Sequence, residues 1–258
     1  MNILILKLIL APVIIGSASL AGRRWGSAVS GWIVGMPLTS GPIIFILAIS
    51  HDAAFAANAA LGVISGGLSL VAYALTYAWL ATRFRWQVTL IGSLLVFIIS
   101  VAVLQNFIFP LIPIFIAVCA ALLIGIRLMP KDAVIEGTET EPSRWDIPAR
   151  ILIGTSFILL LTGIAPFIGP RLTGLLTTIP LYVTIMGIFA QRHQGPTAAA
   201  RLFRGLLYGM FAFTGFFITL GLLLERTSIA AAFLSATLMA LIIQGCSLFV
   251  LRQAHRKI

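Results

Sequence analysis

The feature that most constrains this sequence is a pair of prolines inside a long apolar stretch. The residues from Ser27 to Ser50 are long and apolar enough to cross a bilayer, because about 20 helical residues span about 30 Å. Within this stretch, Pro37 and Pro42 bracket a Leu-Thr-Ser-Gly core. A proline inside a helix removes a backbone hydrogen bond and clashes with the preceding turn. The sequence therefore predicts a broken or strongly kinked helix.

Interrupted backbone at membrane depth has unpaired amide and carbonyl groups and no water to bond. Such backbone is tolerated only where it is buried in protein or lines a polar cavity. We therefore expect the break to lie beside a binding site. The alternative interpretation is a proline kink that serves helix packing alone.

A second copy of this pattern lies 143 residues downstream. Without a gap, residues 24–83 match residues 167–226 at 11 of 60 positions, and Pro37 aligns with Pro180. Four of the seven glycines in the first window meet a glycine in the second, where chance gives about one. Glycine and proline positions reflect backbone geometry rather than general hydrophobicity. We interpret the chain as an internal duplication with a second broken helix around Pro180.

Composition indicates a polytopic α-helical membrane protein. Of the 258 residues, 60 % are hydrophobic and only 9 % are charged, which is far from the composition of a soluble domain. Hydropathy predicts nine membrane spans. They run near Ile3–Leu20, Ser27–Ser50, Ala53–Ala81, Val88–Phe107, Leu111–Met129, Ala149–Ile168, Leu172–Ala190, Thr197–Leu224 and Ile229–Leu251.

The long hydrophilic connection between Pro130 and Pro148 holds five of the seven acidic residues. We interpret it as the linker between two halves. The expected organisation is a first four-helix repeat over residues 1–108, a fifth span with a cytoplasmic linker over residues 109–147, and a second repeat over residues 148–258. Helices 2 and 7 are the expected broken helices.

The distribution of positive charge predicts the topology. Equivalent spans are five apart, an odd number, so they cross in opposite directions and form inverted repeats. With the N-terminus outside and the C-terminus inside, fourteen Lys and Arg residues fall on the inner side and three on the outer side. This bias follows the positive-inside rule. The net charge of +10 is then explained by the loops and by membrane lipids, and no nucleic-acid partner is expected.

Two glycine pairs predict close helix packing. Gly62-x-x-x-Gly66 lies in the third span, and Gly205-x-x-x-Gly209 lies at the equivalent place in the eighth. Small residues four apart allow two helix backbones to approach closely. We expect these faces to pack on the broken helices. Asp52 is expected to cap the third span.

Polar residues gather at both predicted breaks, where freed backbone groups and half-helix N-termini favour a polar or anionic ligand. Inverted-repeat transporters build a midplane site from such paired discontinuous helices. The alternative is that each hydroxyl only bonds back to its own helix. The candidate binding residues are Thr39, Ser40 and Gly41 at the first break and Thr177, Thr178, Tyr182 and Thr184 at the second, with Pro37, Pro42 and Pro180 breaking the helices.

Arg201 and Arg204 lie three residues apart near the start of the eighth span. They either snorkel to the inner headgroups or bind an anion in an inner vestibule, since guanidinium suits carboxylate and phosphate. Asn58, the repeat partner of Arg201, is a candidate neutral group of the same site.

Other chemistry is not expected. Asp52 and Glu225 are the acidic residues outside the linker, and both lie at span ends, so a mid-membrane carboxylate relay is not indicated. Ion coupling through hydroxyls and carbonyls stays open. The histidines are scattered without metal-ligand spacing or a paired carboxylate. We therefore expect no catalysis, no metal and no cofactor.

The segment Met36-Pro37-Leu38-Thr39-Ser40 resembles the Pro-Leu-Thr-Ser stretch of the small GlpM-type bacterial inner-membrane proteins, whose members look like a single unit of this duplication. The equivalent segment of the second half, Ile179–Val183, departs from that motif. The resemblance implies a location in the bacterial inner membrane and carries no defined activity.

The leading functional hypothesis is a secondary transporter or permease that moves a small solute, expected to be anionic or amphipathic, by alternating access. A second hypothesis is a non-transporting membrane subunit that scaffolds or regulates an envelope complex. A third is a lipid or lipid-carrier flippase with a groove open to the bilayer. A homo-oligomer stays open.

Overall fold

The structure is a computed structural model that describes residues 13, 29, 32–130 and 146–256. These described residues form helices and turns and contain no strand. Six helical stretches among them are long and apolar enough to cross a membrane. The fold is that of a membrane-embedded helical protein, as the composition predicts.

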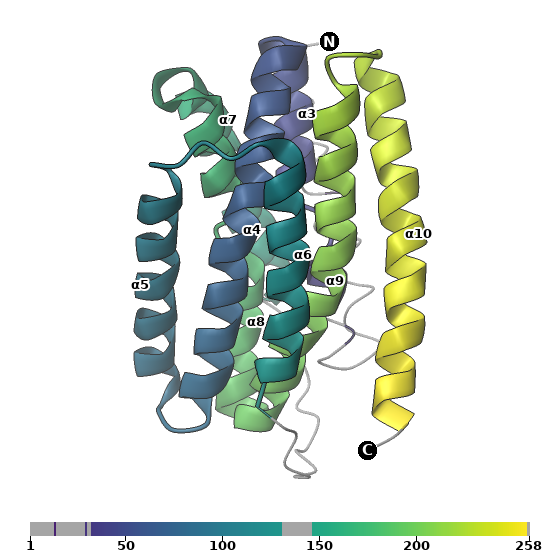
Figure 1. The fold of residues 1–258 in the computed structure, drawn as a ribbon. Helices are drawn as coiled ribbons and strands as arrows, with labels where there is room; N and C mark the ends of the chain where they lie inside the picture. The colour runs from purple at the N-terminus through teal and green to yellow at the C-terminus, as the bar shows by residue number, and fades with distance from the viewer. Residues whose placement is uncertain (1–12, 14–28, 30–31, 131–145, 257–258) are drawn as a thin grey trace.

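Short turns connect most of the helices (Figure 1). Their bounds are α3 Ser40–Ser50, α4 Ala53–Ala81, α5 Trp86–Leu104, α6 Leu111–Leu128, α7 Asp146–Thr177, α8 Leu181–Phe189, a π-helical turn Ala190–Gln194, α9 Pro196–Leu223 and α10 Ile229–Arg256. The predicted third, fourth, fifth, eighth and ninth spans correspond to α4, α5, α6, α9 and α10. The predicted span Ile3–Leu20 lies outside the described residues except for Val13, so the count of nine spans stays a prediction.

The predicted sixth and seventh spans are joined more tightly than the sequence indicates. α7 contains both the sixth span and the start of the seventh, and it kinks at Gly169, where φ is +78°. Glycine adopts this left-handed conformation readily because it has no Cβ. Pro170 follows as the first residue of the next helical segment, a position where its missing amide hydrogen costs little. A kink at one residue therefore replaces the expected loop.

Local sequence sets the starts of the two central helices. The Asp52 side chain accepts a hydrogen bond of 2.6 Å from the amide of Phe55, which confirms the predicted cap of α4. α9 begins with Pro196 after Gly195, whose φ is +90°. Both devices satisfy or remove amide groups that a helix N-terminus leaves without intrahelical partners.

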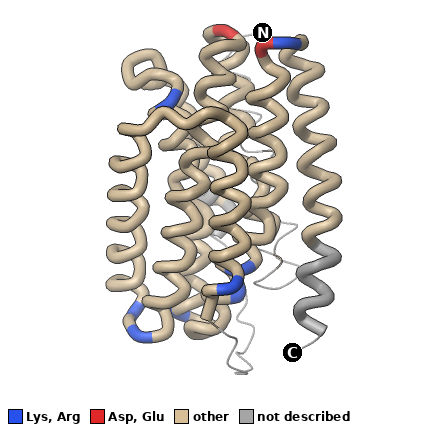
Figure 2. Tube along the Cα trace, viewed as in Figure 1, with Lys and Arg blue, Asp and Glu red and all other residues tan. Residues whose placement is uncertain are grey.

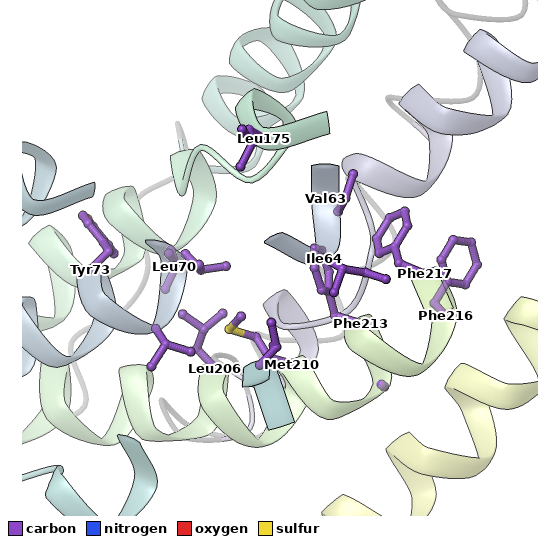
Figure 3. Close-up of a cluster of buried hydrophobic side chains, with 14 of the residues drawn as sticks. Val63, Ile64, Leu70, Tyr73, Leu175, Leu206, Met210, Phe213, Phe216 and Phe217 are labelled. Carbon is purple, nitrogen blue, oxygen red and sulfur yellow. The ribbon is translucent and has the colours of Figure 1, made fainter. Parts of the chain in front are cut away.

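α4 and α9 form the centre of the molecule. Across their most apolar stretches, 72 % and 61 % of the residues are buried, against 22 % for α5, α6 and α10. The surrounding helices α5, α6, α7 and α10 expose large apolar side chains such as Ile98, Ile116 and Leu241, as lipid-facing helices do. Figure 3 shows the apolar core, where Ile64 and Val63 of α4 lie near Phe213 and Phe217 of α9.

The charged residues with described side chains lie in segments at the two ends of the bundle (Figure 2). One end, called here the basic end, brings together the α4–α5 turn, the last turn of α6, the π-helical turn and the start of α9. It carries Arg83, Arg85, Arg127, Arg192, Arg201 and Arg204. At the opposite end, Asp52, Glu225 and Arg226 lie beside helix ends. Arg171 also lies at that end, where it donates a hydrogen bond of 3.2 Å to the carbonyl of Leu104.

Candidate functional site

The predicted second span is interrupted where the prolines predict it. Residues 32–34 are helical, residues 35–39 are not, and α3 begins at Ser40. Inside the break the amide of Leu38 bonds the carbonyl of Met36 at 2.8 Å, which is a tight turn. Pro37 lies in the break. Pro42 lies in the first turn of α3, where a missing amide hydrogen is tolerated.

The second interruption confirms the break predicted around Pro180. The helical part of α7 ends at Thr177, and α8 begins at Leu181. Between them the amide of Leu181 bonds the carbonyl of Ile179 at 2.8 Å. This repeats the tight turn of the first break, because Ile179 and Leu181 are the aligned partners of Met36 and Leu38.

The two breaks meet in the interior of the protein. The hydroxyl of Ser40 donates a buried hydrogen bond of 3.0 Å to the carbonyl of Thr177, 137 residues away. Ser40 is the first residue of one half-helix and Thr177 is the last residue of another. A carbonyl exposed by one break is therefore satisfied by a side chain from the other break, which is what buried backbone at membrane depth requires.

Three predicted hydroxyls bond within their own segment. Thr177 donates to the carbonyl of Gly174 at 2.7 Å, and Thr178 donates to the carbonyl of Leu175 at 2.6 Å. Thr184 donates to the carbonyl of Pro180. This is the local back-bonding that competes with a ligand-binding role for such residues. Ser40 differs from them, because its bond crosses between the two breaks.

Three of the four predicted glycines pack α4 and α9 against the broken helices. Gly209 of α9 packs so closely on the first broken helix that a Cβ there would overlap the carbonyl of Trp32. Gly66 of α4 packs in the same way on the second, where a Cβ would lie 2.5 Å from the hydroxyl of Thr178. Gly62 on the same face abuts the backbone of Arg171. The close approach of backbones depends on the missing side chains.

These contacts occur in equivalent pairs under the 143-residue offset. The contact of Gly209 with Trp32 corresponds to that of Gly66 with Leu175, which also exists. Further along, the ring of Phe216 would touch a Cβ on Gly41 at 3.6 Å. The corresponding pair is Tyr73 and Thr184, whose hydroxyls are 2.6 Å apart. Each central helix therefore contacts one broken helix through matched positions.

The remaining predicted site residues lie at different places. Tyr182 is buried in the first turn of α8, and Thr39 lies half-buried just before α3. Asn58 is exposed near the start of α4 and bonds the carbonyl of Ala54 at 2.9 Å. Arg201 and Arg204 are half-buried at the basic end. The structure therefore brings the hydroxyl residues together at the breaks, while Asn58 and the two arginines lie toward the ends of their helices.

The guanidinium of Arg204 also has a structural partner. It donates a hydrogen bond of 2.6 Å to the carbonyl of Pro130, just past the end of α6. Arg201 lies one turn earlier on α9, at the same basic end.

Sequence reasoning missed a polar anchor from α10. The amide of Gln244 donates a 3.0 Å hydrogen bond to the carbonyl of Trp32, and the indole of Trp32 donates to the hydroxyl of Ser247 at 2.8 Å. Both α10 side chains are buried. Their spacing of three residues on one helix face was the available signal, and the apolar character of the span concealed it.

The arrangement defines a class of protein: a helical membrane protein in which two interrupted helices meet beside two closely packed central helices. Comparisons with protein families, with curated proteins and with solved structures gave no match for this chain. The resemblance to GlpM-type proteins stays a prediction. Within the described residues, no group of three His, Cys, Asp or Glu side chains is placed to hold a metal ion.

Proposed function

We propose that this chain is a small secondary transporter that moves an anionic or amphipathic solute by alternating access. The observation that carries the proposal is the buried bond between Ser40 and Thr177, which joins two interrupted helices from distant parts of the chain. Paired discontinuous helices that meet near the middle of the bundle are how inverted-repeat transporters bind their solutes. A proline kink that served packing alone would not require the two breaks to meet.

Inverted repeats are part of this proposal. They are supported by the matched contacts of Gly209 with Trp32 and of Gly66 with Leu175. They are also supported by the directions of the helices in Figure 1, where α3, α4 and α5 run opposite to α8, α9 and α10 respectively. Alternating access would then come from rocking of one half against the other around the breaks.

The basic end is the proposed cytoplasmic end. Arginine enrichment on one side of the membrane is the signal that fixes topology, and six arginines with described side chains lie at this end. α10 runs toward the same end (Figure 1), which supports a cytoplasmic C-terminus. The bacterial inner membrane remains the proposed location.

The proposed solute path passes the hydroxyl groups at the breaks and opens at the basic end. Ser40, Thr178 and Thr184 already donate their hydroxyl protons to carbonyls, so near the centre they would offer the solute hydroxyl oxygens that accept hydrogen bonds. Arg201 would attract the anionic part of the solute, because a guanidinium pairs well with carboxylate or phosphate. The residue aligned with Arg201 in the first half, Asn58, is neutral, so the attraction of an anion would act only at the basic end.

The proposal is tested by uptake into proteoliposomes, guided by a thermal-unfolding screen of purified protein against small anions and metabolites. A ligand at about 100 times its dissociation constant adds about 2.7 kcal/mol to stability, which such a screen detects. We expect Arg201→Gln to abolish uptake of the stabilising solute without lowering expression. Arg85→Gln, which removes the same charge from the exposed α4–α5 turn, is the matched control and should transport normally.

Retained uptake in Arg201→Gln would remove this arginine from the mechanism. A screen in which no soluble compound stabilises the wild type, with no flux in proteoliposomes, would contradict the transporter. In that case, transbilayer movement of fluorescent phospholipids would test the flippase, and co-purification of a stoichiometric partner would test the scaffold.

A further inference from the structure

α4 carries a row of four hydroxyl side chains that the proposed function has not yet used. Ser65, Ser69, Tyr73 and Tyr77 follow one another at intervals of four residues, so they lie along one side of the helix. All four are almost completely buried. Gly66, on the same side, packs against Thr178 at the second break. The hydroxyl row therefore begins beside the second break and continues along α8.

Two members of the row have protein partners, and two have none within the part of the chain that the structure describes. Ser65 donates to the carbonyl of Leu61 at 3.0 Å. The hydroxyl of Tyr73 lies 2.6 Å from that of Thr184. The hydroxyls of Ser69 and Tyr77 have no hydrogen-bond partner in the described part of the chain, although both residues are 0 % exposed. Leaving such a group unsatisfied costs about 1–3 kcal/mol, so each requires an explanation.

The Tyr73–Thr184 pair has a defined direction. Thr184 uses its one hydroxyl proton to bond the carbonyl of Pro180, so Tyr73 is the donor to Thr184. Tyr73 of the row is thus a donor toward the second broken helix.

The separation between α4 and the second broken helix changes along the row. At Gly66 the backbone of α4 touches Thr178 directly. Farther along, the whole phenol of Tyr73 extends between α4 and Thr184, and the ring of Tyr77 lies against Gly187 and Phe203. The elements therefore diverge past the break. Ser69, which has a short side chain, lies on α4 between these two levels.

The hydroxyl row exists in only one of the two aligned halves. The positions 143 residues after Ser65, Ser69, Tyr73 and Tyr77 hold Tyr208, Ala212, Phe216 and Leu220. Three of these four equivalents are apolar. The contact of Phe216 with Gly41 replaces the hydroxyl pair of Tyr73 and Thr184. Apolar side chains fill the equivalent positions of α9, so helix packing by itself does not require the hydroxyls of Ser69, Tyr73 and Tyr77.

The residues around the second break indicate which kind of chemical group could bond the hydroxyls of Ser69 and Tyr77. The last four carbonyls of the α7 half-helix, from Gly174 to Thr177, each already accept a hydrogen bond. A cation would therefore share each of these oxygens with a hydrogen-bond donor, and α3, α4 and α8 supply no carboxylate to balance its charge. α3, α4 and α8 contain no charged residue, and burying an anion without a counter-charge is costly. Two hydroxyl donors in such an interior suit an uncharged oxygen acceptor.

We infer that Ser69 and Tyr77 line a binding site, opposite the second break, for an oxygen acceptor on an uncharged part of the transported solute. Carbonyl, ether and hydroxyl oxygens are the chemical class that fits. This inference rests on the proposed function and refines it: an anionic group would stay near Arg201, and a neutral polar group would reach Ser69 and Tyr77.

The site is tested by the reactivity of a cysteine placed at Ser69. Cys119 and Cys246, which are both free thiols, are first replaced by alanine. Ser69→Cys is then compared with Ser65→Cys, a matched variant one turn earlier whose hydroxyl bonds its own helix. Both are treated in proteoliposomes with neutral methyl methanethiosulfonate and with its anionic sulfonatoethyl analogue, and each rate is divided by that of exposed Thr227→Cys.

We expect the neutral reagent to modify Ser69→Cys more than about tenfold faster than Ser65→Cys, because a buried thiol outside a solute path reacts only through local opening. We also expect the neutral reagent to react faster at Ser69→Cys than the anionic one. Equal rates for Ser69→Cys and Ser65→Cys would overturn the site. Equal rates for the two reagents at Ser69→Cys would overturn the uncharged class.

Tyr77→Phe provides a second test that does not depend on the cysteine variant folding. Because the Tyr77 hydroxyl has no hydrogen-bond partner among the described residues, its removal should leave the melting temperature of the unliganded protein unchanged or raise it. A clear fall would show that the hydroxyl bonds the protein itself, which contradicts the inference. A reactive Ser69→Cys variant without any solute flux would support the site and contradict the transporter. Solute flux with an unreactive Ser69→Cys variant would support the transporter and contradict the site.

Discussion

At the scale of single residues, the two breaks are stable because side chains replace the hydrogen bonds that the helices lose. The carbonyls of Trp32 and Thr177 are both satisfied by residues from distant segments, Gln244 and Ser40. In water these groups would be solvated, but in a bilayer each unsatisfied group costs several kcal/mol. The polar residues at the breaks are therefore structural components before they are ligands.

Removing the Ser40 hydroxyl tests its structural part. We expect Ser40→Ala to lower the free energy of unfolding by about 1 kcal/mol, since buried hydrogen bonds in membrane proteins average about 0.6 and reach about 1.7 kcal/mol. Reversible unfolding in mixed micelles measures the change. Ser50→Ala, at the exposed end of the same helix, should be neutral. A Ser40→Ala variant as stable as the wild type would contradict a bond between the two breaks.

Part of this residue-scale picture could be predicted from the sequence. Pro37 and Pro180 locate the breaks, because proline acts on its own backbone and the effect is local. The bond partner of Ser40 could not be predicted, because pairing across 137 residues depends on how separate helices pack. The row from Ser65 to Tyr77 is visible in the sequence as a four-residue spacing, but its apolar neighbours make it look like an ordinary buried helix face.

At the scale of helices, glycine faces determine how the broken helices cross α4 and α9. At Gly66 and at Gly209, backbone atoms of a broken helix lie so close that they would contact a Cβ atom if one were present. The repeated spacing of these glycines predicted which helices would pack. The kink at Gly169 was not predicted, since an isolated glycine before proline is equally compatible with a loop.

Alanine at Gly66 or Gly209 should push the central helix away from the broken helix that it crosses. We expect each substitution to destabilise the protein by about 1–3 kcal/mol, because the added methyl group overlaps atoms of the broken helix and the helices must move apart. Gly163→Ala in α7 is the matched control. Nothing lies within 4 Å of a Cβ at that position, so the change should be neutral or slightly stabilising. Wild-type stability in Gly209→Ala would contradict the close crossing.

At the scale of the whole molecule, the bundle has one strongly basic end and an interior whose helices α3, α4 and α8 carry no charge. The composition predicted a membrane protein, because a surface that faces lipid instead of water requires a high content of apolar residues. Composition alone could not predict the number of spans or the inverted repeats, because both depend on the order in which the segments are arranged along the chain.

Topology follows from the basic end and can be measured. Phe84 lies in the turn between α4 and α5, and Thr227 lies in the turn between α9 and α10; both are exposed. In a cysteine-free background, we expect an impermeant maleimide applied to intact cells to label Thr227→Cys and not Phe84→Cys. Lysed cells should show labelling of both. Labelling of Phe84→Cys from outside would invert the proposed orientation.

The anchor between Trp32 and α10 has a consequence for biosynthesis. The chain emerges from the ribosome in order, and Trp32 precedes its partner Gln244 by 212 residues. The carbonyl of Trp32 therefore enters the membrane long before its final donor exists. Until α10 is inserted, that carbonyl must bond the translocation machinery, water or a temporary neighbour. Insertion of α10 therefore completes the hydrogen bonding of the first interrupted helix.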